Sequence, residues 1–193
     1  MTTQILLVIY IFLLFYVIER SLFAFEVSKG TKPTKKAWLT FIPFLTYIVL
    51  FFISVIEFSL TIRPLNLIAT LSGVIIFAWG VYLRYQAIIA FSVNKQKWRN
   101  DIDTKNIHAI VRSGPYNFVR HPYYLSVILE LCGIALLLNA FTAIIFILLI
   151  QVPLLWKRIT VEESELIKKF ANEYLLYKKQ VAILFSLKGR KKK

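Results

Sequence analysis

Residues 114–126 bring a positive charge, an imidazole, phenols and turn-forming residues together in a chain that is otherwise largely apolar. Arg120 supplies a fixed positive fork, and His121 is the residue type that titrates near neutrality. Pro122 fixes the backbone just before an apolar run that begins at Tyr123. Because charged groups are costly at the edge of a membrane unless they bind something, this segment is a candidate binding or catalytic site.

A second polar group, made of Arg158, Glu162 and Glu163, follows the last long apolar block. An ordinary explanation exists, since Arg158 and Glu162 stand four apart and could form an exposed helix pair contributing a few tenths of a kcal/mol. Interfacial aromatic residues and positively charged anchors are equally ordinary near a membrane. These explanations do not account for the His-Pro pair and the Gly-Pro turn, so we expect the two groups to meet in one pocket.

The elements that must position these groups are membrane helices. The chain has 193 residues, of which 58% are hydrophobic and 16% aromatic, and its mean hydropathy is +0.66. A helix of about 20 apolar residues crosses the hydrocarbon layer of about 30 Å. Five long apolar blocks are present, namely Gln4–Ile18, Trp38–Ile56, Leu65–Phe91, Tyr123–Leu138 and Ala140–Trp156. The sequence therefore predicts an all-α, polytopic membrane protein with about five transmembrane helices.

The fourth and fifth blocks are separated by Asn139 and predict a helical hairpin over 123–156, although sixteen residues give only about 24 Å. If its two helices pack antiparallel, both polar groups lie at the same end. The first block lacks a preceding basic stretch and a following cleavage pattern, so we interpret it as a retained helix. We expect transmembrane helices in residues 1–91 and a catalytic region in residues 92–193.

The net charge of +14 reports membrane topology. All Lys and Arg residues except Arg63 and Arg84 lie between the first and second blocks, between the third and fourth, or after the fifth. This positive-inside pattern predicts an outside amino terminus, with the carboxyl terminus and the site in the cytoplasm, at the plasma membrane if the cell is prokaryotic. We expect no nucleic-acid partner. Cys132 is a single cysteine and the two histidines lack cysteine partners, so we expect no metal site.

Two stretches outside the apolar blocks are long enough to carry structure. Residues 92–121 are rich in Asn and Asp and contain the turn Ser113-Gly114-Pro115, so they predict a mostly irregular cytoplasmic loop. The tail from Lys157 predicts an amphipathic helix, which could lie on the membrane surface or fold back against the loop. Its apolar stripe consists of Leu166, Phe170, Tyr174, Tyr177 and Val181. Glu130 stands separately, midway along the fourth block, with Arg84 as its expected partner.

The chain from about Leu83 to Val181 resembles the isoprenylcysteine carboxyl methyltransferase family. The ordered residues that carry the resemblance are Gly114-Pro115-Tyr116, Val119-Arg120-His121-Pro122, Tyr124, a helical hairpin, Arg158, Glu162-Glu163 and the apolar stripe of the tail. Three positions depart from the pattern. Ser126 and Ala171 stand where the family usually has glycine, and Ala182 stands where it commonly has proline. These changes bear on substrate fit more than on methyl transfer.

The resemblance implies an enzyme that binds S-adenosylmethionine in a cytoplasm-facing pocket. That cofactor carries a carboxylate, an ammonium group, hydroxyls and an adenine, so it needs cationic donors, a carboxylate acceptor and an aromatic surface. By resemblance, His121 and Tyr124 line the cofactor site, Arg120 orients the cofactor, and Glu162 accepts hydrogen bonds.

The resemblance also implies a lipophilic acceptor that enters from the bilayer. Arg158 and Glu163 would be the catalytic residues on the acceptor side, with Arg158 anchoring an anionic oxygen. A carboxylate acceptor needs no strong base. A phenolic acceptor, with a pKa of about 10, needs Glu163 or His121 as a base. A prenylated cysteine carboxylate and a phenolic lipid both remain candidates.

Three other functions fit parts of the pattern. Membrane sterol reductases share an Arg-His-Pro-x-Tyr element but bind NADPH, and phospholipid amine methyltransferases belong to a broader related group. A membrane scaffold without activity explains the topology but not the polar groups. Binding of S-adenosylmethionine rather than NADPH separates the first of these from a methyltransferase.

Overall fold

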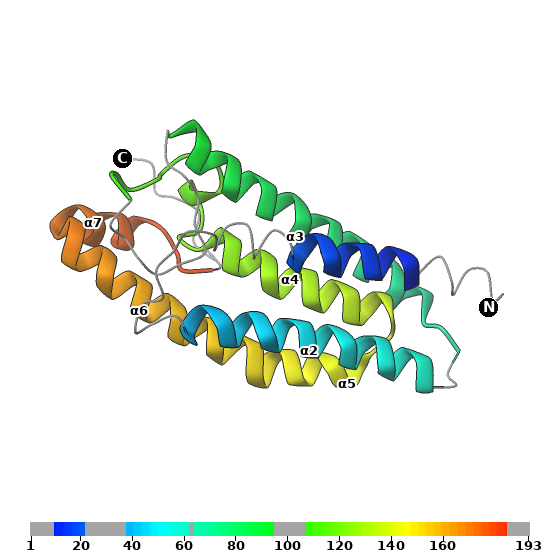
Figure 1. Ribbon diagram of the computed structural model, residues 1–193. Coiled ribbons are helices and arrows are strands. Elements are labelled where there is room, and N and C mark those ends of the chain that lie inside the picture. The colour runs from blue at the N-terminus through cyan, green and yellow to red at the C-terminus, as the bar shows by residue number, and fades with distance from the viewer. Residues whose placement is uncertain (1–9, 22–37, 62–63, 95–106, 185–193) are drawn as a thin grey trace.

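The computed structural model describes residues 10–21, 38–61, 64–94 and 107–184, which form an elongated bundle of helices (Figure 1). Residues 10–21 are helical. The further elements are α2 (Trp38–Leu60), α3 (Leu67–Val93), the 3-10 turn η2 (Gly114–Asn117), α4 (Pro122–Leu137), α5 (Phe141–Phe146), the π-helical turn η3 (Ile147–Gln151), α6 (Val152–Phe170) and α7 (Asn172–Gln180). Residues 4–9 of the first predicted block, much of the predicted loop and the basic tail lie outside the described residues.

Three of the described helices are long and apolar enough to cross a bilayer, namely Trp38–Leu60, Leu67–Val93 and the continuous helix Phe141–Phe170. α4 is apolar but has only 16 residues. The lipid-facing sides of the long helices expose large apolar side chains, such as Ile68 and Ile75 on α3. The chain is therefore an all-helical integral membrane protein, as its composition predicts.

The fifth apolar block and the start of the tail helix, which the sequence divides by polarity, belong to one continuous helix. α5, η3 and α6 follow one another without a break, so a single helical rod runs from Phe141 to Phe170. The change at Trp156 and Lys157 is a change of polarity, and residues of either kind sustain a helix. Lys157 lies over the ring of Trp38 at 4.7 Å from its centroid. The rod therefore carries the polar group of α6 beyond the apolar part of the bundle.

The tail also departs from the single amphipathic helix that its stripe predicts. Ala171 has a φ of +44°, a conformation that ends α6 and turns the chain into α7. After α7, Val181 is extended. Leu166, Tyr174, Tyr177 and Val181 nevertheless form one buried cluster, which packs against Ile107 and Ile110 of the loop. The tail therefore folds back against the loop, which is one of the two arrangements that the sequence allows.

α3 and α4 pack with their backbones in direct contact. A Cβ added at Gly73 would lie 2.3 Å from the backbone nitrogen of Leu137, and one at Gly133 would lie 2.5 Å from that of Phe77. Small residues permit this close approach of membrane helices. The contact brings Arg84 of α3 beside Glu130 of α4, with 3.3 Å between Nε and Oε1, as the sequence predicts.

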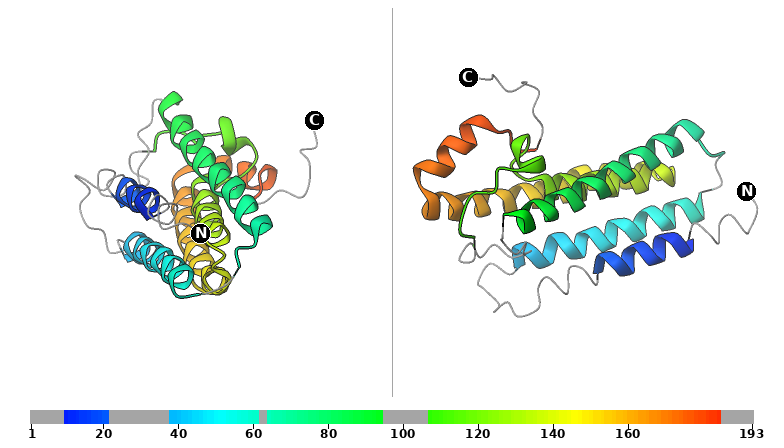
Figure 2. Two further views of the ribbon diagram at one scale, coloured as in Figure 1. Left: turned by 90° about the vertical axis from the view of Figure 1, so that its right-hand side faces the viewer. Right: turned by 90° about the horizontal axis from the view of Figure 1, so that it is seen from above.

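The hairpin closes at Asn139, whose φ of +55° produces a tight reversal. Its side-chain oxygen accepts a hydrogen bond from the backbone nitrogen of Asn66 at 2.8 Å. Glu57 of α2 caps α5 by accepting from the backbone nitrogens of Thr142 and Ala143, at 3.1 and 3.0 Å. The two arms are therefore antiparallel, and the start of α4 lies at the same end of the bundle as α6 and α7 (Figures 1 and 2).

Candidate functional site

The carboxyl-terminal segment after α7 fixes the backbone of the Arg-His element. Val119 and Ala182 form an isolated parallel bridge. The backbone nitrogen of Arg120 donates to the carbonyl of Ala182 at 2.8 Å, and that of His121 donates to the carbonyl of Ile183 at 3.2 Å. The element therefore begins α4 in an orientation that is set by residues far downstream in the sequence.

Glu163 of α6 gathers three donors around one buried carboxylate. Arg120 Nε lies 2.8 Å from Oε1, His121 Nε2 lies 3.3 Å from the same oxygen, and Lys178 Nζ lies 2.7 Å from Oε2. Arg120 and Glu163 are only 6% and 5% exposed. Hydrogen bonds to the charged form stabilise it. Glu163 is thus held as an anion that ties α6 to α7 and to the start of α4.

Arg120 donates to three acceptors within the protein. Besides Glu163, its guanidinium donates through Nη1 to the carbonyl oxygens of Lys178, at 3.0 Å, and Val181. A planar fork that meets several acceptors at once is held in one orientation. This geometry indicates that Arg120 positions Glu163 and the backbone at Lys178 and Val181.

Tyr124 links the other predicted site residues. Its hydroxyl accepts a hydrogen bond from Arg158 Nε at 2.8 Å and donates to Glu162 Oε2. The guanidinium of Arg158 also lies over the Tyr124 ring, 5.1 Å from the centroid. On its other side the ring stacks with His121, with centroids 5.6 Å apart and planes 22° apart. The six predicted residues therefore form two clusters, which this stacked pair joins.

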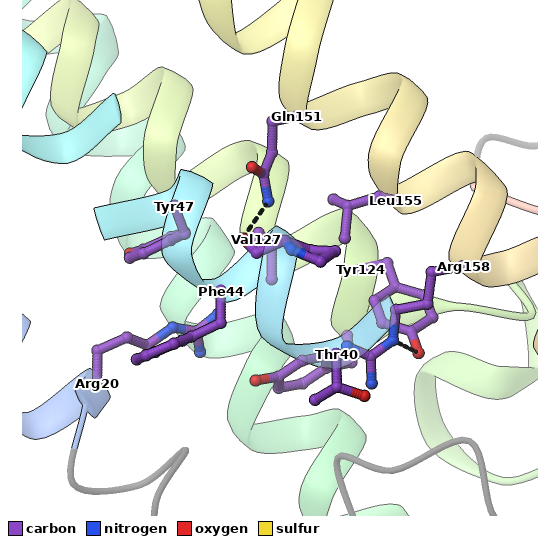
Figure 3. Close-up of a pocket in the computed structure, with 11 residues that line it drawn as sticks. Arg20, Thr40, Phe44, Tyr47, Tyr124, Val127, Gln151, Leu155 and Arg158 are labelled. Carbon is purple, nitrogen blue, oxygen red and sulfur yellow. Dashed lines mark hydrogen bonds between the residues drawn. The ribbon is translucent and has the colours of Figure 1, made fainter. Parts of the chain in front are cut away.

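A pocket opens beside Arg158 and Tyr124, between α2, α4, α6 and the helical residues 10–21 (Figure 3). Its walls combine apolar side chains with phenols, a hydroxyl, one amide and two guanidinium groups. The lining residues are Arg20, Thr40, Pro43, Phe44, Tyr47, Tyr123, Tyr124, Val127, Gln151, Leu155 and Arg158. Apolar walls with a few placed polar groups are typical of sites for small organic ligands. The pocket therefore brings apolar side chains and two guanidinium groups together in one place.

Two buried phenols hold α7 against the loop. Tyr177 donates to the carbonyl of Tyr116 at 2.7 Å, which fixes the turn η2. Burial raises the pKa of both Tyr177 and Tyr174 well above the ordinary value for a phenol. Both side chains therefore remain protonated, and Tyr177 remains a donor. Gly114, with a φ of +57°, begins this turn.

Reasoning from the sequence missed four polar residues of the pocket, namely Arg20, Thr40, Tyr47 and Gln151. Gln151 carried a usable signal, because an amide inside an apolar block normally has a partner. It donates to the carbonyl of Pro43 at 3.1 Å and accepts from Thr46 Oγ1 at 2.6 Å. Arg20 and Tyr47 carried no such signal, because a basic or phenolic residue in a membrane helix is also an ordinary anchor.

Residues 73–168 of the chain match the model of the isoprenylcysteine carboxyl methyltransferase (ICMT) family. The chain is 34% identical over 123 residues to a protein-S-isoprenylcysteine O-methyltransferase of Saccharomyces cerevisiae, a match that covers 60% of this chain and 48% of the relative. A protein of the same name from Schizosaccharomyces pombe is 31% identical over 104 residues, covering 53% of this chain and 43% of the relative. The chain thus spans about half the length of the curated relatives it matches. No solved structure matches it significantly.

Proposed function

Because this chain belongs to the isoprenylcysteine carboxyl methyltransferase family, we propose that it transfers a methyl group from S-adenosylmethionine to a lipophilic acceptor taken from the membrane. The observation that carries the proposal is the contact chain from Glu162 through Tyr124 to Arg158, whose last two members line a pocket with both apolar and polar walls. A carboxylate, a phenol and a guanidinium in hydrogen-bonded order suit a polar cofactor, and the apolar walls suit the lipid part of an acceptor.

The donors and acceptors present fit the proposed cofactor. S-adenosylmethionine supplies, when bound, an electrophilic methyl group on a positively charged sulfur. His121 and Tyr124 offer an aromatic surface, and Glu162 offers an acceptor for ammonium or hydroxyl groups. Arg120 acts indirectly, by holding His121 and Glu163 in place.

Arg158 is the group that we propose to hold the acceptor. Its side chain is 3% exposed and lines the pocket, and Tyr124 fixes its Nε. A fixed guanidinium can orient a carboxylate for an in-line displacement, in which orientation supplies much of the rate. A positioned cation of this kind raises the rate without taking up a proton.

A carboxylate acceptor is favoured over a phenol. A phenol must lose its proton at a pKa of about 10, so it needs a base. Glu163 is a poor one, because Arg120, His121 and Lys178 already occupy its oxygens. We therefore propose the carboxylate of an S-prenylated cysteine as the acceptor class. Glu163 then positions Arg120, His121 and Lys178 and does not act as a base.

We further propose five membrane helices, with the amino terminus outside and the site on the cytoplasmic side. The helical residues 10–21 and α4 would complete the set of spans, and the distribution of Lys and Arg supports this orientation. In this scheme residues 92–193 supply the cofactor groups. Residues 1–91 contribute one wall of the pocket through α2 and Arg20.

The experiment that tests this function follows ligand binding and methyl transfer in purified protein. Addition of S-adenosylhomocysteine at 100 times its dissociation constant should stabilise the fold by about 2.7 kcal/mol, whereas NADPH should not. Labelled methyl should pass to N-acetyl-S-farnesylcysteine but not to a phosphatidylethanolamine, and an Arg158→Ala variant should lose transfer while still binding S-adenosylhomocysteine. Stabilisation by NADPH alone would indicate a reductase, and label in the phospholipid would indicate an amine methyltransferase.

A further inference from the structure

Arg20 is a buried guanidinium on the wall of the pocket. It belongs to the helical residues 10–21 and is only 4% exposed. Its guanidinium carbon lies 5.2 Å from the ring centroid of Tyr47 and 5.3 Å from that of Tyr123, both of which also line the pocket. Figure 3 shows Arg20 and Arg158 on different sides of the pocket. The pocket therefore has two separate cationic groups, and the proposed methyl transfer uses only one.

The hydrogen bonds around Arg20 are incomplete. Within the described part of the chain, Nη1 is buried and has no hydrogen-bond partner. Nε lies 3.8 Å from Glu130 Oε2, which is an ion pair but too long for a hydrogen bond. A buried donor without an acceptor is costly, so its persistence in a pocket wall points to an acceptor supplied by a ligand.

The neighbouring Arg84 shows the contrast. Arg84 lies 3.3 Å from Glu130 through Nε and donates to both carboxylate oxygens of Glu19, at 3.2–3.3 Å. Glu130 additionally accepts from the hydroxyl of Tyr16. Both arginines thus flank the same carboxylate and are similarly buried, but Arg84 is absent from the pocket lining. Arg84 Nε and Glu130 Oε1 also lack a hydrogen bond within the described residues, but these two atoms face each other across the 3.3 Å ion pair. Arg20 Nη1 has no such acceptor among the described residues, and it belongs to the arginine that lines the pocket.

The charges in this group decide what kind of acceptor fits. Arg20 and Arg84 carry two positive charges, and Glu19 and Glu130 carry two negative charges. The group is therefore balanced in charge. Arg84 Nε and Glu130 Oε1 form an ion pair with each other, which leaves Arg20 Nη1 as the buried donor without an acceptor in the described part of the chain. An uncharged oxygen satisfies Nη1 without adding a second buried anion, which would need its own cation. A carbonyl oxygen is the simplest group with this property.

We propose that Arg20 donates through Nη1 to an uncharged oxygen of the acceptor molecule, at a second point away from the oxygen that Arg158 holds. The ligand class is an amphiphile with a carboxylate and a separate carbonyl oxygen on one apolar chain. This inference rests on the proposed function, because it assigns the carboxylate to Arg158. Two fixed points instead of one select acceptors by the spacing of their oxygens.

The test is a double-mutant cycle in which one protein side chain and one ligand group are removed, singly and together, and binding affinities are compared. N-acetyl-S-farnesylcysteine and 3-(S-farnesylthio)propionate share the carboxylate and the farnesyl chain, and only the first has the acetamido carbonyl. Their affinities are measured with S-adenosylhomocysteine present, so that no turnover is needed. In the wild type the acetamido group should strengthen binding about tenfold, which is typical for a hydrogen bond to a charged donor. In Arg20→Met this difference should fall below about twofold.

Arg84→Lys is the matched control, because Arg84 flanks the same carboxylate but does not line the pocket. It should keep the tenfold preference even where its thermal stability falls. If Arg20→Met does not fold, Arg20→Lys retains the charge beside Glu130 and should still lose most of the preference. A preference that persists in the Arg20 variants, or is lost equally in Arg84→Lys, overturns the inference.

The same measurements separate this inference from the proposed function. Methyl transfer to either probe by the wild type tests the function alone. Transfer with an unchanged preference in the Arg20 variants leaves the function intact and refutes the role of Arg20. If neither probe binds the wild type, the proposed acceptor class is wrong and the inference is refuted with it.

Discussion

Removing one oxygen from Tyr124 tests the contact chain on which the proposed function depends. Tyr124→Phe keeps the ring, and with it the stacking on His121 and the surface under Arg158. It deletes the acceptor of Arg158 Nε and the donor to Glu162. The substitution therefore separates the hydroxyl from the aromatic surface, which a change to alanine cannot do.

The size of the effect follows from the burial of the two partners. Arg158 is 3% exposed, so water does not readily replace the lost acceptor. A hydrogen bond to a charged group contributes about 1.5–3 kcal/mol. Glu162 is only partly buried and can recover a partner from solvent. Since each 1.4 kcal/mol is about a factor of ten, we expect kcat/KM for methyl transfer to fall about 10- to 100-fold.

The assay compares labelled methyl transfer to N-acetyl-S-farnesylcysteine in wild type, Tyr124→Phe and Tyr82→Phe. Tyr82 is a 53% exposed tyrosine of α3 that does not line the pocket, so its variant should behave as wild type. Thermal unfolding with S-adenosylhomocysteine reports whether each variant folds. A folded Tyr124→Phe protein with kcat/KM within twofold of wild type would refute the argument that the hydroxyl orients Arg158.

Two further predictions concern the backbone that positions the site. Gly73→Ala should lower the stability of the protein by about 1–3 kcal/mol in detergent, because the new Cβ lies 2.3 Å from the backbone nitrogen of Leu137 and α3 must move away from α4. Ala171→Gly should raise stability by about 1 kcal/mol, because a φ of +44° strains alanine by more than glycine loses in chain entropy. Thermal unfolding measures both.

Each backbone prediction has a control of known sign. Ala78 of α3 is exposed, so Ala78→Gly should cost only the helix propensity of about 1 kcal/mol. Stabilisation by Gly73→Ala would mean that propensity outweighs the clash. Ala182 lies in an extended bridge, so Ala182→Gly should destabilise. If Ala171→Gly also destabilises, the turn between α6 and α7 does not strain alanine.

The sequence singled out the candidate site residues because they are chemically out of place, and the structure brings them together. Arg120, His121, Arg158 and the pair Glu162-Glu163 interrupt or follow apolar blocks, where a charge is costly. The hairpin over 123–156 is equally readable, because Asn139 alone separates two apolar runs. Antiparallel packing then follows from the short connection, and it brings the two polar groups to one end.

The sequence could not predict which partners each of these residues contacts. Glu162 and Glu163 are adjacent and of the same type, yet one meets Tyr124 and the other meets Arg120, His121 and Lys178. Neighbouring helix positions point about 100° apart, so their partners depend on which helices lie on either side. Only the packed structure supplies those neighbours.

The breaks in the tail show the same limit. The apolar stripe predicts the buried face correctly, because Leu166, Tyr174 and Tyr177 all pack in one cluster. It does not predict the turn at Ala171, since alanine favours helix and yet has a positive φ here. The pairing of Ala182 with Val119 is likewise a long-range contact that has no local signal.

The sequence by itself determined that this is a helical membrane protein, and it predicted the candidate site residues, because hydrophobic length and misplaced charge are local properties. The tertiary structure alone decided that Tyr124 orients Arg158 and that Glu163 holds Arg120. It also decided that Arg20 lines the pocket with an Nη1 that has no partner among the described residues. These are properties of distance between segments. Distance between segments is set by how the helices pack, above all by the close contact of α3 with α4.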